Sequence, residues 1–193
     1  MLSYTFWHWK QPDVAADAYE ARQRAFHAAL AATPPSGYAR SYSAAIAGAP
    51  WANQGGDAYE DWYLVGGFAD LGALEEAAVT ASRQAPHDAA AALAAGGTAG
   101  LYRARLGEVA SAAAAAAAPR SAQWFDKPDG VRYPELFAAM APVVARARGT
   151  LWIRQMALGP AAEFCLQAEA PAELPLGIAA RPLALRPVWR GGA

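Results

Sequence analysis

The stretch SYTFWHW, residues 3–9, is a short aromatic segment of the kind that favours a β-strand. Pro12 stops it, and an alanine-rich helical segment follows, which Asp13 can cap and which runs to Ala32. Residues 33–37 (TPPSG) then end this helix, because proline removes a backbone donor and glycine permits a turn. The chain is therefore expected to open with a strand and then a helix.

The segments after residue 37 complete a recognisable unit. Strands are predicted at residues 38–47 and 58–67, and a further strand at residues 101–106. Between the last two, a helix that Asp70 can cap is followed by a shorter turn, which is expected to end at the glycines 96–97. The order strand, helix, strand, strand, helix, strand is the split βαβ pattern of ferredoxin-like domains.

The rest of the chain gives the same order in a shorter form. A strand is predicted at residues 123–127 and a helix at 134–149, which Pro142 should kink or divide. A hairpin at 151–158 and 162–168 and a last strand at 183–189 follow. Residues 169–180 are too short and too rich in proline for a second helix. Because Pro182 and Pro187 lie at opposite parity, the last strand should be short or at a sheet edge.

These two units predict an α+β fold. Two ferredoxin-like (β-α-β-β-α-β) halves are expected to pack antiparallel sheets into one α/β barrel, with the second half abridged. The expected organisation is a full half at residues 1–109, an alanine-rich linker at 110–120 and the abridged half at 121–193. A chain that carries both halves can close its barrel as a monomer, although its outer edges could also pair in a homodimer.

Composition argues against several classes of function. The chain has 193 residues, with 16 basic and 17 acidic side chains, so it lacks the single-sign field that draws proteins to nucleic acid. It has neither a signal-like start nor the roughly 18 apolar residues of a membrane span, so no membrane partner and a cytoplasmic location are expected. Aromatic residues must supply the core, and the single cysteine, Cys165, is expected to be a buried, inert thiol.

The element order resembles that of the dimeric α/β barrel superfamily, as a degenerate tandem duplication. Weak echoes between the halves support the resemblance: tyrosine precedes glutamate at residues 19–20 and 133–135, and an arginine lies in each second strand, Arg40 and Arg154. Members of this superfamily include cofactor-independent monooxygenases, haem-handling enzymes and small proteins with no known activity. The resemblance therefore implies no single function, but it implies that a ligand lies between sheet and helices or inside the barrel.

Alternation along the predicted strands brings polar side chains onto shared faces. A pocket made by His8, Arg40, Tyr42, Arg103 and an acidic residue of the third strand, such as Asp61, would bind a carboxylate or an enolate through arginine. In the alternative interpretation, the arginines and acids form structural pairs and the histidine is merely hydrogen-bonded.

The sequence also predicts the surroundings of three other residues. Trp51 lies in the glycine-flanked loop between the second and third strands, where it is either a lid that contacts ligand or an anchor for the loop. His27 is expected on the solvated face of the first helix, beside Glu20 and Arg24. Tyr38 is expected to share the face of Arg40, because the two are separated by one residue.

No catalytic signature, phosphate loop or metal-ligand spacing occurs in the sequence. The favoured function is therefore a non-enzymatic binding or assembly module, with a small molecule as a possible ligand. The alternative is a small-molecule enzyme of the cofactor-independent monooxygenase or haem-handling type, acting in a barrel cavity. Neither a metal nor a cofactor is expected, although His8 is a conceivable axial ligand for haem.

Overall fold

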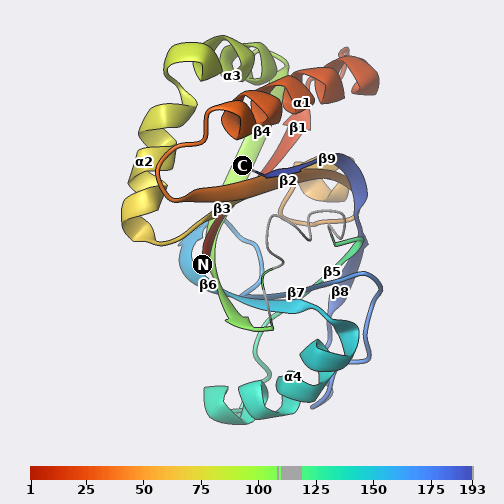
Figure 1. The fold of residues 1–193 in the computed structure, drawn as a ribbon. Helices are drawn as coiled ribbons and strands as arrows, with labels where there is room; N and C mark the ends of the chain where they lie inside the picture. Colours follow the sequence, from red (N-terminus) through yellow and green to blue (C-terminus); the bar gives the residue numbers. More distant parts are fainter. Residues whose placement is uncertain (108, 110–118, 193) are drawn as a thin grey trace.

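The computed structural model describes residues 1–107, 109 and 119–192, so most of the expected linker at 110–120 lies outside the described residues. The helices and strands follow the predicted order (Figure 1). Their bounds are β1 (Leu2–Lys10), α1 (Ala16–Ala32), β2 (Tyr38–Ile46), β3 (Ala58–Val65), α2 (Phe68–Ala78), α3 (Gln84–Ala91), β4 (Ala94–Leu106), β5 (Ser121–Phe125), α4 (Tyr133–Ala147), β6 (Thr150–Leu158), β7 (Phe164–Ala168), β8 (Arg181–Ala184) and β9 (Arg186–Gly192).

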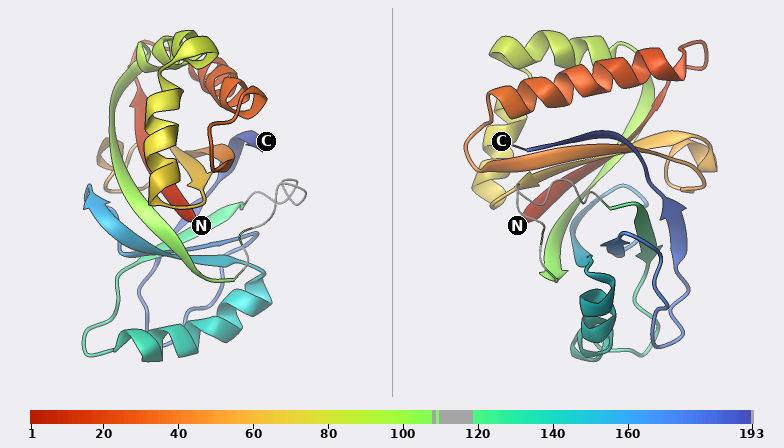
Figure 2. Two further views of the ribbon diagram at one scale, coloured as in Figure 1. Left: turned by 60° about the vertical axis from the view of Figure 1, so that its left-hand side comes forward. Right: turned by 45° about the vertical axis from the view of Figure 1, so that its right-hand side comes forward.

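The strands of the described residues form one antiparallel sheet of nine strands, in the order β8-β5-β7-β6-β4-β1-β3-β2-β9. Its two edges, β8 and β9, follow each other in the chain with only Leu185 between them. The C-terminal segment pairs with β5 before Leu185 and with β2 after it, so it joins the two edges. The molecule is therefore an α+β protein with a nearly closed, barrel-like sheet (Figure 2).

The two parts of the chain use the same relative order of strands. In the first part the order is β4-β1-β3-β2, and in the second it is β8-β5-β7-β6. Each part thus places its fourth strand beside its first and its third beside its second. No helix separates β7 from β8 among the described residues, whereas α2 and α3 separate β3 from β4.

Helices cover the sheet on two opposite sides. Helices α1, α2 and α3 lie over the outer face of the first four strands, and α4 lies over the second part of the sheet (Figures 1 and 2). Tyr19, Gln23, Phe26 and Leu30 of α1 are buried against the sheet, as their helical spacing predicts. None of the described helices is both long and apolar enough to cross a bilayer.

Tryptophan and tyrosine rings fill the interior of the barrel. Trp7, Trp62, Trp124 and Trp152 are all buried, and their rings contact one another at tilted or edge-on angles. Glu60 lies among these rings and accepts hydrogen bonds from the indole nitrogens of Trp7 at 2.8 Å and Trp62 at 2.6 Å. The prediction that aromatic residues supply the core is confirmed.

Strand β4 is longer than predicted, because two glycines lie inside it instead of ending a helix. It begins at Ala94, whereas the sequence predicts a strand only from residue 101. The rings of Phe6 and Trp9, on the paired strand β1, occupy the space that side chains at Gly97 and Gly96 would need. The glycines therefore leave room for these aromatic rings over β4.

The structure tests the predictions made for four prolines in the second part of the chain. Pro142 does not divide its helix, since α4 is one helix from Tyr133 to Ala147. Pro134 lies in the first turn of α4, as predicted. Pro182 and Pro187 fall in β8 and β9, which confirms an edge position and shows that the predicted last strand is two strands, of four and seven residues.

The two predicted aspartate caps are wrong. Helix α1 begins at Ala16 and α2 at Phe68, and neither has a side-chain cap. Asp70 instead lies in the first turn of α2, where its negative charge still faces the positive end of the helix dipole.

Candidate functional site

A cavity of about 590 Å³ lies between the outer face of the sheet and helices α1 to α3. Most of its walls are apolar, and Phe68, Val79 and Met156 are exposed at its edge. The apolar lining residues are Tyr4, Phe6, Phe26, Leu30, Leu71, Leu74, Ala78 and Leu101. The buried polar lining residues are His8, Tyr19, Gln23, Asp61 and Tyr63. The cavity thus offers an apolar body with a concentrated polar group, as small-molecule sites commonly do.

The polar group is assembled from two neighbouring strands and a helix. His8 of β1 lies opposite Tyr59 in the β1–β3 pairing, so Asp61, two residues further along β3, points to the same face. Tyr19 and His27 come from α1, eight residues apart, which places both on the side of the helix that meets the sheet. All four side chains are buried.

Asp61 is the centre of this group. Its Oδ2 atom accepts a hydrogen bond from the Tyr63 hydroxyl at 2.9 Å. Nε2 of His8 lies 3.1 Å and Nε2 of His27 lies 3.2 Å from the same oxygen. Each is a close contact that becomes an ion pair when the histidine is protonated, and its angles depart from those of a full hydrogen bond.

The Nδ1 atom of each histidine also has a hydrogen-bond partner. Nδ1 of His8 hydrogen-bonds the Tyr19 hydroxyl at 2.7 Å, and Nδ1 of His27 hydrogen-bonds the Ser41 hydroxyl at 2.7 Å. Tyr38 in turn donates to Ser41 at 2.7 Å. If each hydroxyl donates toward the imidazole, each neutral histidine carries its proton on Nε2, facing Asp61. Both series of donors, from Tyr19 through His8 and from Ser41 through His27, then point to the Asp61 carboxylate.

The electrostatics agree with that direction of donation. Burial raises the pKa of Tyr19 and of Tyr63, and the nearby charge of Asp61 adds to the effect, so both hydroxyls keep their protons. Burial by itself would raise the pKa of the Asp61 carboxyl. The positive charges that His8 and His27 can carry outweigh burial and hold this pKa below its ordinary value.

One oxygen of Asp61 remains available. Oδ1 is buried and has no hydrogen-bond partner in the structure, whereas Oδ2 has three contacts. An unpaired buried carboxylate oxygen is costly, so it favours a ligand or a water that donates a hydrogen.

No set of three or more ligating side chains in the described residues could hold a metal ion.

The predicted pocket residues do not all come together. His8 and Asp61 lie on the helix side of the sheet, and Tyr42 lies on the barrel side, where its ring stacks on Trp62. Arg40 lies against Tyr42 on that same side, with its guanidinium 5.9 Å from the ring centroid. A β-bulge between Tyr38 and Arg40 explains why Tyr38 faces the helices instead of sharing the face of Arg40.

The remaining predicted site residues lie elsewhere. Arg103 is exposed on β4, where it donates to the Gln155 side chain at 3.2 Å and lies over the Phe68 ring. Trp51 packs edge-on against Trp7 and Trp124, in the arrangement expected of a loop anchor. Cys165 is buried in the barrel interior, as expected.

Sequence reasoning missed His27, Tyr19 and Tyr63 as members of the site. The expectation that His27 is solvated is wrong: its exposed fraction is 0%, because α1 presses it against β2 and β3. A signal was present, since Tyr19, Gln23 and His27 recur every four residues and form one stripe of the helix.

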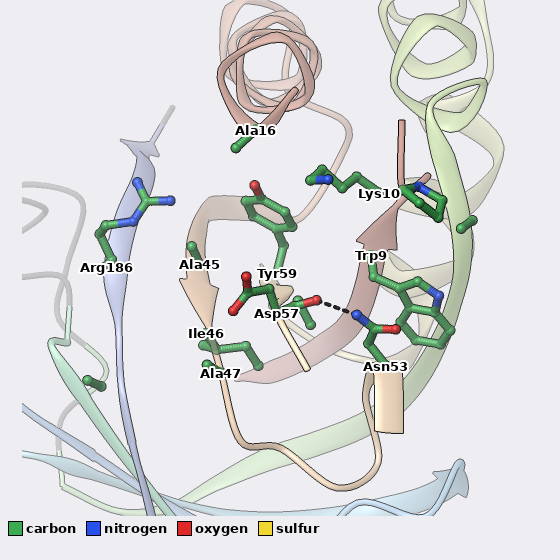
Figure 3. A pocket seen from close by; sticks show the side chains of 14 residues that line it. Trp9, Lys10, Ala16, Ala45, Ile46, Ala47, Asn53, Asp57, Tyr59 and Arg186 are labelled. Atoms are coloured by element: carbon green, nitrogen blue, oxygen red, sulfur yellow. Dashed lines mark hydrogen bonds between the residues drawn. The ribbon is translucent and has the colours of Figure 1, made fainter. Parts of the chain in front are cut away.

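A second hollow, of about 740 Å³, lies at the end of the barrel below α1 (Figure 3). Lys10 and Arg186 lie on opposite sides of Tyr59, and the Asn53 amide donates to the backbone oxygen of Asp57 at 2.8 Å (Figure 3). Arg186 is already paired with Glu20. Because no buried polar side-chain atom among its described lining residues lacks a partner, this hollow is a weaker candidate than the helix-side cavity.

The sequence matches no protein-family model and no curated protein. Its fold is similar to that of solved structures at very low sequence identity. A candidate monooxygenase from Fusobacterium nucleatum is 8% identical with a TM-score of 0.62, and the match covers 100% of this chain and 95% of that one. An anthrone oxidase-like protein is 11% identical with a TM-score of 0.53, covering 100% and 93%. A candidate monooxygenase from Lactobacillus acidophilus is 8% identical with a TM-score of 0.50, covering 100% and 98%.

Proposed function

We propose that the chain is a small-molecule enzyme of the cofactor-independent monooxygenase type, which oxygenates an acidic CH2 group of an aromatic compound in the helix-side cavity. The observation that carries this proposal is a proton-accepting chain, Tyr19 to His8 to Asp61, on the wall of a largely apolar cavity. Solved structures of similar fold are named as monooxygenases or as anthrone oxidase-like, which supports this reaction class over a purely structural module.

The first step is removal of a proton from the CH2 carbon. The C–H bond breaks, its electron pair spreads into the aromatic system, and the proton passes to the Tyr19 oxygen as the tyrosine proton passes to Nδ1 of His8. The resulting imidazolium lies 3.1 Å from the Asp61 carboxylate, which stabilises its charge. The histidine therefore acts as the base and Asp61 orients it and balances its charge.

Molecular oxygen is the oxidant. The carbanion transfers electrons to O2, a C–O bond forms, and the returning proton gives a hydroperoxide. Loss of the second C–H proton with cleavage of the O–O bond then releases water and leaves a carbonyl. In total, CH2 and O2 give C=O and H2O, so the reaction balances without another reductant. The largely apolar walls suit a planar aromatic substrate.

Anthrone is a suitable probe for this proposal. The wild-type protein should accelerate its conversion to anthraquinone above the rate in buffer, with one O2 consumed for each product. Tyr19→Phe and His8→Gln should each lower kcat by about 10²-fold, with a smaller effect on KM, because they remove the relay but leave the apolar walls in place. An oxygen electrode and product absorbance measure both quantities.

Arg22→Gln is the matched control, since Arg22 is exposed on α1 and does not line the cavity. It should retain the wild-type rate. A wild-type rate equal to that in buffer would overturn the assignment of the reaction. Full activity in Tyr19→Phe, which keeps the ring in place, would overturn the role of the relay.

Haem fits this site poorly, and we infer that the reaction proceeds without it. An axial histidine needs an imidazole nitrogen facing the iron. Both nitrogens of His8 instead face protein groups, Tyr19 at 2.7 Å and Asp61 at 3.1 Å. Titration with haem should therefore leave the haem absorbance spectrum unshifted, and a shifted Soret band that depends on His8 would contradict this inference.

We also propose that the barrel derives from a tandem duplication of a ferredoxin-like unit, whose second copy lost a helix. The matching strand orders of the two parts support this origin. The joining of both sheet edges by residues 181–192 supports closure of the barrel within one chain.

A further inference from the structure

We propose that the barrel has a second binding site, on the inner side of the sheet beside Arg40, which takes an aromatic carboxylate. The site is a cavity of about 1040 Å³ bordered by β2, β6, β7 and the end of α4. Two buried hydrogen-bond donors without partners line it, and its rim carries an excess of arginine. This site is separate from the helix-side cavity, because Arg40 and His8 lie on opposite faces of the same sheet.

Arg40 is the first of the two donors. Its side chain is 7% exposed, and its Nε atom is buried without a hydrogen-bond partner. No carboxylate of a described residue lies within ion-pair distance of this guanidinium, which lies 5.9 Å from the centroid of the Tyr42 ring. A buried guanidinium nitrogen without an acceptor is costly, and the charge is permanent, so the site favours an anionic ligand.

Gln167 is the second donor, and its orientation is determined by its neighbours. The Tyr42 hydroxyl at 2.7 Å and the Trp152 indole nitrogen at 2.9 Å both donate to Oε1. Because the Trp152 indole N–H can only donate, the amide cannot be flipped, and Nε2 must point away from it. Nε2 is buried and has no partner, and Gln167 is only 5% exposed. Two donors in one cavity that both lack an acceptor indicate a ligand that supplies oxygen atoms.

The remaining lining residues define the rest of the ligand. Arg120, Arg146 and Arg148 are exposed at the rim, together with Glu169 and Glu173, so the described residues of the rim carry a net positive charge. Leu64, Trp152 and Tyr42 form an apolar and aromatic wall. A carboxylate between the two donors with an aromatic body against this wall satisfies both features.

Benzoate and its neutral analogue benzyl alcohol test this proposal by titration calorimetry of the wild-type protein. Benzoate should bind and benzyl alcohol should not, and the benzoate affinity should fall as salt is raised. Arg40→Gln should weaken benzoate binding by about tenfold or more, because it removes a charge-assisted contact. Gln167→Glu keeps the acceptor for Tyr42 and Trp152 but adds a negative charge, so it should also weaken binding.

Arg103→Gln is the matched control, because Arg103 is exposed on β4 and does not line this cavity. It should bind benzoate as the wild type does. Failure of benzoate to bind the wild type would overturn the proposal, and so would equal binding of benzyl alcohol or unchanged affinity in a folded Arg40→Gln variant. The outcome is independent of anthrone oxidation, which Arg40 does not serve.

Discussion

Replacing Asp61 with asparagine is expected to lower the free energy of unfolding by about 3–5 kcal/mol at neutral pH, because it removes the acceptor of a buried charged cluster. One carboxylate oxygen receives His8 at 3.1 Å, His27 at 3.2 Å and the Tyr63 hydroxyl at 2.9 Å. Asparagine is neutral, and its amide nitrogen is itself a donor, so it cannot satisfy all three. Urea unfolding followed by tryptophan fluorescence measures the loss.

The same carboxyl should make stability depend on acid pH. Burial alone would raise its pKa, but the facing histidine charges hold the pKa below the ordinary aspartate value of 3.8. Asp61 therefore stabilises the fold fully above pH 3.8, and this contribution is lost as the pH falls through the folded-state pKa. The stability difference between wild type and Asp61→Asn should consequently shrink in acid.

Asp88→Asn is the control for this change. Asp88 also contacts a histidine, His87 at 3.0 Å, but its side chain is 61% exposed. The control should change the free energy of unfolding by less than about 0.5 kcal/mol. Equal losses at the two positions, or a difference that stays constant into acid, would show that the Asp61 cluster does not stabilise the fold.

Stability should fall by about 3 kcal/mol between pH 4.5 and pH 7 because of Glu60. Burial raises the pKa of this carboxyl from 4.5 to about 7, against the opposing effect of the Trp62 and Trp7 hydrogen bonds. The folded protein thus holds the Glu60 proton more tightly than the unfolded chain does. The protonated form favours folding, so this contribution is complete below pH 4.5, declines as the pH rises, and is lost above about pH 7.

Glu60→Gln isolates this effect, since glutamine cannot ionise. The variant leaves one indole N–H facing an amide NH2, so it should be less stable than the wild type in acid. Its disadvantage should shrink or reverse as the pH rises. Glu76→Gln, an exposed position on α2, should show a constant difference from wild type. A Glu60→Gln difference that does not change with pH would contradict the raised pKa.

Glu60 and Asp61 illustrate how neighbouring acids acquire opposite properties. They are consecutive in β3, so their side chains point to opposite faces of the sheet. Glu60 enters a barrel interior filled by tryptophan, where burial raises its pKa. Asp61 faces two histidines from β1 and α1, and these lower its pKa. The residues that surround each carboxyl, and not its residue type, therefore decide whether its pKa is raised or lowered.

The site was only partly predictable. Alternation in β1 and β3 is local, and it correctly indicates that His8 can share a face with an acid of the third strand. The joint pocket of His8 with Arg40 and Tyr42 does not form, and it divides into two cavities on opposite sides of the sheet. The neighbours of His27 along its helix indicate a solvated position, and this is wrong, because a single helix does not reveal how wide its buried face will be.

The order of strands and helices was readable from local pattern, because aromatic runs, alanine-rich runs, proline and glycine act over a few residues. Contacts between distant segments were not readable in this way. An extra residue in β2 at Ala39 reverses the face of Tyr38, and a switch at Leu185 joins the two sheet edges and closes the barrel. Which face a strand residue takes depends on bulges and on pairing partners far along the chain. Long-range packing therefore decided which of the polar residues meet Asp61 and which meet Gln167.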